Sequence, residues 1–216
     1  ELDKELERRG LPFVRYADDS MIFCKSKRAA MRVKESITRF IENVLYLKVN
    51  KEKTVVSYVR GVKYLGYSFY VMKGECQLTV HPKSKAKMKS RLKELTSRSN
   101  GWGYAKRKQK LKEYIRGWVG YYHLANMKRL LLETDEWLRR RIRMCIWKAW
   151  KKVKTKVANL IRCGINKYQA YEWGNTRKGY WRIADSPVLK RAIDNNKLRS
   201  AGYATLMGSY LEWHPK

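Results

Sequence analysis

Acidic residues are scarce in this chain of 216 residues: 19 Asp and Glu stand against 50 Lys and Arg, so the formal net charge is +31. An excess of this size indicates a polyanionic partner. Aromatic residues make up 12% of the chain, and because rings stack on bases and sugars, nucleic acid is favoured over a membrane surface. The alternative is a basic surface that is solvated and has no specific partner.

Cysteines are also few and scattered. Cys24, Cys76, Cys145 and Cys163 form no C-x-x-C pair and have no His cluster nearby, so neither a zinc site nor a disulfide framework is expected, and a reducing cytosol is the default compartment. No apolar run is long enough to cross a bilayer, and the N-terminus lacks the apolar core of a signal peptide. We therefore expect a cytoplasmic protein with no membrane partner.

Two adjacent carboxylates, Asp18 and Asp19, lie between the short apolar runs Phe13–Tyr16 and Met21–Cys24. The four residues from Ala17 to Ser20 supply turn chemistry, so the segment predicts a β-hairpin with the acids at its tip. Mg²⁺ takes hard oxygen ligands and usually keeps waters and substrate phosphates. In phosphoryl transfer two such ions activate the attacking oxygen and stabilise the leaving one. A bare Asp-Asp pair is more often ordinary turn chemistry; the apolar flanks favour the metal site.

The rest of the N-terminal part predicts a small α+β unit. Residues 1–10 predict a helix that Gly10 stops, and Ser26 is placed to cap a helix over about 28–47. A polar connection follows this helix. Three strands are then expected, over 55–59, 62–69 and 77–80.

Beyond His81 the composition changes to helix formers and bases. Apolar residues recur at helical spacing over 84–97 and over 108–122. The run Thr134–Glu136, with two acids in the first turn, predicts the start of a third helix that continues to Val157. Three helices that each carry one apolar face predict a small bundle.

The last part of the chain predicts shorter helices. Asn166 is placed to cap a helix that ends at Gly174, and Ser186 followed by Pro187 is a helix start. The segment 197–211 is expected to be helical as well.

Five motifs occur in a fixed order along the chain. They are Arg15-Tyr-Ala-Asp-Asp19, Leu47-x-x-Asn50-x-x-Lys53-Thr54, Tyr64-Leu-Gly-Tyr-x-Phe69, Tyr114-Ile-Arg-Gly-Trp-Val-Gly-Tyr-Tyr122 and Trp137-Leu-Arg-Arg-Arg-Ile142. In this order they resemble the group II intron reverse transcriptases, also called maturases. The likeness spans nearly the whole chain.

The resemblance implies an α+β fold in three parts. These are a partial reverse-transcriptase palm of antiparallel strands plus a helix over 1–82, an all-α thumb bundle (domain X) over 83–161, and a small helical, basic DNA-binding region over 162–216. Fingers and the first palm carboxylate would precede Glu1, so this piece alone is expected to be inactive. The end of the chain resembles the compact bacterial class without a nuclease domain, which implies a bacterial cytosol.

The resemblance also implies roles for single residues. Asp18 and Asp19 match the family's catalytic metal ligands for two Mg²⁺ ions. Lys53 matches the lysine that protonates the pyrophosphate leaving group, with a solvated loop lysine as the alternative. The primer grip is matched by Tyr64, Leu65, Gly66 and Tyr67. The basic side chains expected to bind nucleic acid are Lys85, Lys89, Arg91, Lys106, Arg107, Lys108, Arg116, Arg139, Arg140, Arg143, Lys148, Lys151 and Lys152.

The implied function is RNA-directed DNA polymerisation together with a role in intron splicing. The implied partners are structured intron RNA, an RNA template–DNA primer duplex and target DNA, and the oligomeric state stays open. Two other hypotheses are an RNA-binding splicing cofactor without polymerase activity and a reverse transcriptase of retron or CRISPR-associated lineage. The paired acids argue against the first, and the Arg-Gly-Trp motif with the basic terminal segment argues against the second.

Overall fold

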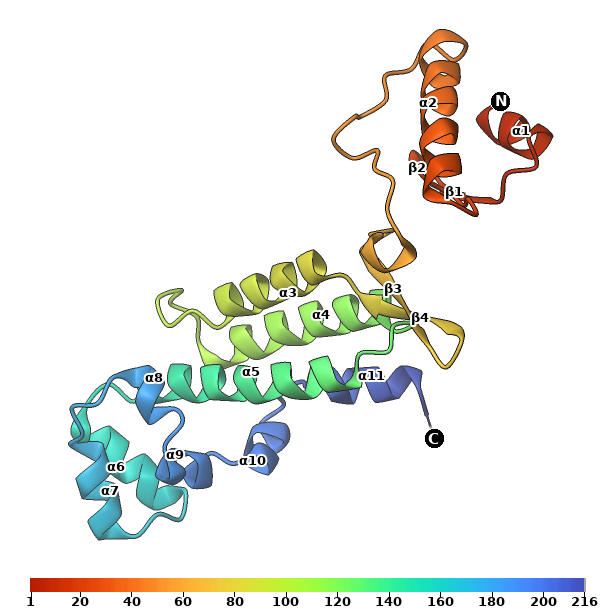
Figure 1. The fold of residues 1–216 in the computed structure, drawn as a ribbon. Coiled ribbons are helices and arrows are strands. Elements are labelled where there is room, and N and C mark those ends of the chain that lie inside the picture. Colours follow the sequence, from red (N-terminus) through yellow and green to blue (C-terminus); the bar gives the residue numbers. More distant parts are fainter. Residues whose placement is uncertain (216) are drawn as a thin grey trace. The chain divides into compact units, whose positions relative to one another are not determined.

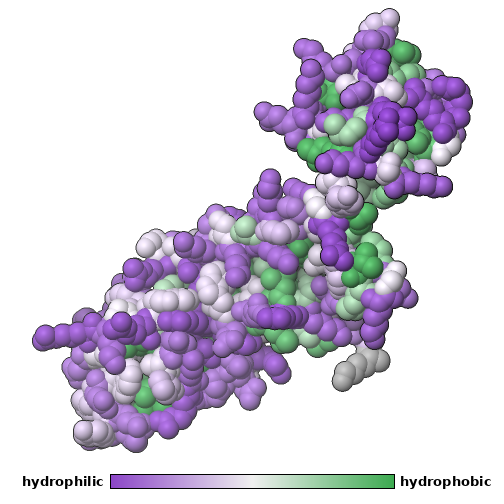
Figure 2. Space-filling model, in the orientation of Figure 1, coloured by the Kyte–Doolittle hydropathy of each residue, from purple (hydrophilic) through white to green (hydrophobic). Residues whose placement is uncertain are grey.

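The structure is a computed structural model that describes residues 1–215. It divides into two compact units, an N-terminal unit of Glu1–His81 and a C-terminal unit of Pro82–Lys216 (Figure 1). Hydrophilic side chains cover most of the face of each unit seen in Figure 2. No helix among the described residues is long and apolar enough to cross a membrane.

The N-terminal unit combines helices with two antiparallel hairpins. Its elements are α1 (Leu2–Arg8), β1 (Phe13–Tyr16), β2 (Asp19–Ile22), α2 (Lys27–Asn43), the 3-10 turn η1 (Val59–Gly61), β3 (Tyr67–Met72) and β4 (Glu75–Val80). β1 pairs only with β2, and β3 only with β4, among these strands. The predicted α+β class is confirmed for this unit.

The predicted hairpin is confirmed, with a tighter turn than expected. Phe13 lies opposite Ile22 and Tyr16 opposite Asp19, so β2 begins at Asp19 and only Ala17 and Asp18 form the turn. A two-residue connection suits the right-handed twist of paired strands. Asp18 therefore ends the turn, and Asp19 is the first residue of the returning strand.

Helix α2 begins where the sequence predicts and ends earlier. The backbone N–H of Ala29 donates to the Ser26 hydroxyl at 3.2 Å, which confirms the cap. The helix stops at Asn43 rather than near residue 47. Tyr46, with a φ of +55°, lies outside helical backbone space.

Two of the three predicted strands need correction. Residues 55–58 are irregular and lead into η1, so the strand predicted over 55–59 is wrong. The strand predicted over 62–69 begins only at Tyr67. β-branched residues favour a strand only where a neighbour pairs with them. The strand predicted over 77–80 is confirmed as β4, which pairs with β3.

The C-terminal unit is entirely helical in its described part. Its first three helices are α3 (Pro82–Leu95), α4 (Tyr104–Tyr122) and α5 (Lys128–Ala149). Each buries one apolar stripe, and the buried residues are Met88, Leu92 and Leu95 of α3, Leu111, Ile115 and Val119 of α4, and Leu131, Leu138 and Ile142 of α5. The predicted bundle is confirmed, and Figure 1 shows the three helices side by side.

The predicted bounds of α5 are wrong at both ends. The helix begins at Lys128, so Thr134 lies inside it, and its hydroxyl donates to the Leu130 carbonyl at 2.7 Å instead of capping. It ends at Ala149 rather than Val157, and the following residues form a separate helix, α6 (Val153–Arg162). Helix α4 likewise begins four residues before the predicted residue 108.

Five short helices complete the chain: α7 (Lys167–Gly174), α8 (Tyr180–Ile183), α9 (Pro187–Ala192), α10 (Asn195–Ser200) and α11 (Leu206–Trp213). The predicted caps are confirmed, because Asn166 accepts from Gln169 N and Ser186 accepts from Leu189 N. The helix predicted over 197–211 is divided into α10 and α11. Helix α11 returns to pack against α4 and α5.

Candidate functional site

The two acids predicted as metal ligands are exposed at the tip of the first hairpin. Ala17, the first turn residue, has a φ of +52°, which primed two-residue turns require and which a non-glycine residue seldom adopts. Asp18 and Asp19 follow directly and are both exposed. The turn thus presents two neighbouring carboxylates on a constrained backbone.

Arg15 holds this turn in place through hydrogen bonds. Its guanidinium forms two hydrogen bonds of 2.6 Å with the two carboxylate oxygens of Asp3 in α1, and it donates a third bond of 3.1 Å to the Ala17 carbonyl. Hydrogen bonding from Arg15 holds the pKa of Asp3 below its ordinary value. Arg15 is part of the first motif, and its bracing role is absent from the sequence expectations because Asp3 lies twelve residues away.

The donor set at the tip fits one Mg²⁺ ion. Mg²⁺ is usually held by one or two carboxylates together with substrate phosphates and waters. Asp18 and Asp19 meet that requirement. No group of three or more His, Cys, Asp and Glu side chains in residues 1–215 is placed to hold a metal ion, so these two acids alone underligate a two-ion site.

The segment that carries Lys53 is a turn organised by Asn50. The Lys53 N–H donates to the Asn50 side-chain oxygen at 3.1 Å, and the Thr54 hydroxyl donates to the Asn50 carbonyl at 2.8 Å. These bonds explain why the second motif pairs Asn50 with Thr54. Lys53 itself is exposed.

The predicted primer grip forms a second strained turn. Tyr64 and Tyr67 exchange backbone hydrogen bonds of 3.1 and 2.9 Å, and between them Leu65 and Gly66 have φ values of +49° and +83°. A left-handed backbone at a branched residue such as Leu65 costs on the order of 1–3 kcal/mol and often marks a functional segment. The Gly66 carbonyl accepts from His81 N at 3.0 Å. The structure thus makes a tight turn at Gly66.

The basic residues predicted to bind nucleic acid divide by burial. Exposed side chains belong to Lys89, Arg91, Lys106, Arg116, Lys151 and Lys152, and half-buried ones to Lys85, Lys108, Arg139, Arg140 and Lys148. Arg107 and Arg143 are only 5% and 6% exposed. These two arginines lie inside the unit and are not part of its basic surface.

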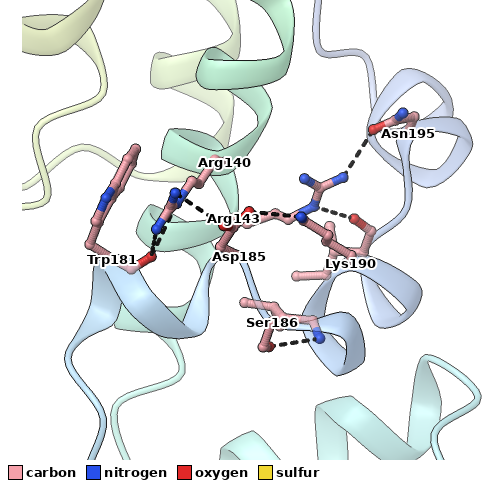
Figure 3. Close-up of polar contacts among 9 residues, drawn as sticks. Arg140, Arg143, Trp181, Asp185, Ser186, Lys190 and Asn195 are labelled. Atoms are coloured by element: carbon pink, nitrogen blue, oxygen red, sulfur yellow. Dashed lines mark hydrogen bonds and ion pairs between the residues drawn. The ribbon is translucent and has the colours of Figure 1, made fainter.

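The buried arginines donate hydrogen bonds to other parts of the C-terminal unit. Arg143 donates from Nε to the Ile193 carbonyl at 2.7 Å and from Nη2 to the Asn195 side chain at 2.9 Å, as Figure 3 shows. Burial lowers the pKa of the Arg143 guanidinium. Arg107 donates to the Asn100 side chain at 3.1 Å. Arg143 therefore fastens α5 to the end of α9 and the start of α10.

Arg140 is half-buried, and most of its donors have partners within the protein. Its Nε and Nη2 donate to the Trp181 carbonyl at 3.2 and 3.0 Å, and its Nη1 lies 3.1 Å from Asp185. Lys190 lies 2.8 Å from the same carboxylate, and its hydrogen bond holds the pKa of Asp185 below the ordinary value. Few donors of Arg140 remain for phosphate.

Asp135 is a structural residue whose surroundings the sequence predicted wrongly. It is 2% exposed rather than a solvated first-turn acid, and its two carboxylate oxygens accept from Leu206 N and Met207 N at 2.8 and 2.9 Å. Burial raises the pKa of Asp135, and the two backbone bonds oppose that rise. A signal was available, because Asp135 falls at helical spacing between Leu131 and Leu138 on the buried stripe.

Comparison with known families now adds to the geometry. Residues 1–69 match the family described as reverse transcriptase (RNA-dependent DNA polymerase), and residues 85–164 match the group II intron, maturase-specific domain. The chain belongs to the group II intron reverse transcriptases. No curated protein matched the chain in a sequence search.

This reverse transcriptase is an RNA-directed DNA polymerase with a maturase role in intron splicing. Reverse transcriptases generally use Mg²⁺, and both matched domains act on nucleic acid, including intron RNA. Nothing in the structure or the family matches favours a splicing cofactor without polymerase activity or a retron or CRISPR-associated lineage.

The two matches cover different parts of the maturase. The reverse-transcriptase match contains the Asp18–Asp19 hairpin, the Lys53 turn and the Tyr64–Tyr67 turn. The maturase-specific match contains most of α3 and all of α4, α5 and α6. Helices α7 to α11 lie outside both matches.

Proposed function

We propose that Asp18 and Asp19 bind Mg²⁺ in the polymerase site, together with phosphates of the incoming nucleotide. The observation that carries the proposal is the pair of exposed carboxylates on a turn braced by Arg15. Bound Mg²⁺ supplies positive charge where phosphoryl transfer develops negative charge. Because phosphoryl transfer is catalysed mainly by positioning and electrostatics, the rigid turn holds the ligands where a primer hydroxyl attacks in line.

Two further segments serve the same reaction. Lys53 protonates the pyrophosphate leaving group, a role that its exposure on the Asn50 turn permits. The Tyr64–Tyr67 turn steadies the primer end, which its constrained backbone supports. Asp18 and Asp19 alone do not fill a two-ion site, so we assign them one Mg²⁺ ion.

The C-terminal unit holds the polynucleotide. Residues 83–161 act as the thumb and contact the template–primer duplex and intron RNA, and residues 162–216 bind target DNA; residues 1–82 belong to the palm. The proposed phosphate-binding residues are Lys85, Lys89, Arg91, Lys106, Lys108, Arg116, Arg139, Lys148, Lys151 and Lys152. Arg107, Arg140 and Arg143 are left out because other parts of the protein occupy them. Removing one phosphate-binding lysine or arginine is expected to make the slope of log affinity against log salt concentration shallower by about 0.7–0.9.

Replacing Asp18 with Ala in the intact polypeptide tests the proposal. cDNA synthesis in a primer-extension assay is expected to disappear, while affinity for intron RNA changes less than about twofold, because the tip contributes metal binding and does not bind phosphate directly. Glu7→Ala, which removes an exposed acid from α1, is the matched control and keeps full activity. Retained synthesis by the Asp18→Ala variant rules out Asp18 as a metal ligand.

A further inference from the structure

Three aromatic rings, one in α7 and two in α8, each lie against a cation. Lys178 Nζ is 5.1 Å from the centroid of the Trp173 ring, the Arg98 guanidinium carbon is 5.1 Å from that of Tyr180, and the Arg140 guanidinium carbon is 3.9 Å from that of Trp181. All are within the range of cation–π attraction. All three rings follow residue 164, in the part that neither family match covers.

Tyr180 and Trp181 are exposed in spite of their size. Their exposed fractions are 37% and 39%, whereas the residue that follows Arg182, Ile183, is buried at 1%. The apolar side of α8 is therefore supplied by Ile183. Both rings keep exposed surface that is available to a ligand.

The Trp181 ring is held rigidly before any ligand arrives. Figure 3 shows the Arg140 side chain between this ring and Asp185. The guanidinium is fixed by the Trp181 carbonyl at 3.0 Å and by Asp185 at 3.1 Å, and it stacks on one side of the indole. Binding to a ring that is already ordered loses less entropy than binding to a mobile one.

The charge around these rings is positive. Arg177, Lys178 and Arg182 are exposed close to them in the chain. The nearby Asp185 is already bonded to two cations, Arg140 and Lys190, so it repels an incoming anion little. Exposed rings beside basic side chains are the combination that proteins use to bind single-stranded nucleic acid.

We propose that Tyr180 and Trp181 form a stacking site for unpaired bases, with flanking phosphates held by Arg177, Lys178 and Arg182. The inference rests on the proposed DNA-binding role of residues 162–216 and deepens it by naming a single strand as the ligand. A duplex cannot use the site, because its base faces are covered by neighbouring bases. Single-stranded DNA and RNA share the required chemistry of π faces and phosphates.

Oligonucleotide binding separates stacking from charge. Affinities are measured by fluorescence anisotropy for four labelled probes: a dT 12-mer, a U 12-mer, an abasic 12-mer with the same phosphates, and a 12-base-pair DNA duplex. In the wild-type protein the dT or U probe is expected to bind at least tenfold more tightly than the abasic probe, because each stacked base adds to the affinity. The dT and U arms show which strand is preferred.

Substitutions then locate the stacking. Trp181→Leu and Tyr180→Leu are each expected to reduce the ratio of dT or U affinity to abasic affinity about fivefold or more. The abasic and duplex affinities themselves are expected to stay unchanged within twofold. Tyr180→Leu leaves the Arg140 anchor in place and remains informative if Trp181→Leu unfolds. Tyr46→Leu, at an 86% exposed ring of the N-terminal unit, is the control and keeps the ratio.

Two results overturn the proposal. One is a wild-type affinity for abasic probe equal to that for dT and U, and the other is a ratio that neither substitution changes. In both cases duplex affinity still reports whether the protein binds DNA. Loss of the stacking proposal is thereby distinguished from loss of the proposed DNA-binding role.

Discussion

Removing the Asp135 carboxylate tests how the end of the chain is fastened to the bundle. The side chain extends from the middle of α5 to the first two N–H groups of α11, at 2.8 and 2.9 Å. The first four N–H groups of a helix have no partner within the helix. Asp135→Ala therefore leaves two buried or half-buried donors, Leu206 N and Met207 N, without their acceptor.

The size of the effect follows from two opposing contributions. Hydrogen bonds to a charged group stabilise a protein by about 1.5–3 kcal/mol each, which gives an upper limit of about 6 kcal/mol for the pair. Burial of the charge opposes this, as the raised pKa of Asp135 shows. The cavity beside Asp135 has a volume of about 30 Å³, enough for a water molecule to replace part of the missing hydrogen bonding. We expect a net loss of about 2–4 kcal/mol.

Thermal unfolding followed by circular dichroism measures the loss. For a unit of this size each kcal/mol lowers the Tm by roughly 3 °C, so Asp135→Ala is expected to lower it by about 6–12 °C. Glu136→Ala removes the same charge from the next, exposed position and is expected to change the Tm by less than 2 °C. Equal melting temperatures for the two variants would refute the reasoning.

Two further substitutions test buried groups of the same unit. The Tyr203 hydroxyl is buried without a hydrogen-bond partner among the described residues, so Tyr203→Phe is expected to be neutral or to stabilise by up to about 1 kcal/mol at pH 7. Burial raises the pKa of Tyr203 from 10 to about 12. Because this hydroxyl ionises first in the unfolded chain, it costs the wild type stability between pH 10 and 12. The variant lacks this contribution, so its Tm is expected to fall less than that of the wild type between pH 7 and 11. A lower Tm of the variant at pH 7 would show that the hydroxyl has a partner. A Cβ added at Gly174 would lie 2.6 Å from Val157 Cγ2, so Gly174→Ala is expected to lower the free energy of unfolding by about 1–3 kcal/mol in denaturant titrations. Gly179→Ala is the control, because its added atom meets no described atom within 4 Å. Equal stability of the two variants would contradict the close packing of α7 on α6.

Local signals were predictable from the sequence, and pairing across the fold was not. The caps at Ser26, Asn166 and Ser186 bond to a backbone N–H three residues ahead, so the sequence alone contains the whole interaction. Thr134 and Asp135 resemble such a cap, and their true partners are Leu130 and the distant α11. A local pattern cannot show that a longer-range partner competes for the same side chain.

The candidate site divides in the same way. Turn chemistry between two apolar runs predicts the Asp18–Asp19 tip. The sequence does not predict that Arg15, held by Asp3, braces this turn. Lys106, Arg107 and Lys108 are three consecutive basic residues, yet only Arg107 is buried. Its spacing of four residues from Leu111 places it on the apolar stripe of α4, so attention to helical register would have removed it from the expected surface.

The C-terminal unit shows how lysine and arginine side chains find hydrogen-bond partners in a chain with few acidic residues. Many of its cationic side chains donate to backbone carbonyls at or just past the ends of helices, instead of to carboxylates. The donors are Lys108, Arg141, Arg143, Lys148 and Lys197, and the acceptors are the carbonyls of Ala201, Lys93 with Thr96, Ile193, Arg98, and Cys163 with Ala192. The C-terminal ends of helices leave carbonyls unpaired and carry partial negative charge, so such bonds stabilise both groups.

This mode of bonding has a consequence for nucleic-acid binding. A carboxylate would cancel the charge of the base that it holds, whereas a carbonyl leaves the full positive charge in place. Bases such as Arg143, which fasten helices together and cannot touch a phosphate, therefore still add to the potential that draws a polyanion to the surface. Lys108 and Lys148 each donate one ammonium N–H to a carbonyl, and because an ammonium has three donors they remain among the proposed phosphate-binding residues. Arg143, which is buried, is expected to act only through its field, so its removal lowers both the attraction for a polyanion and the stability of the unit. The high net charge is consistent with a fold held together by helix ends so that few acids are needed inside it.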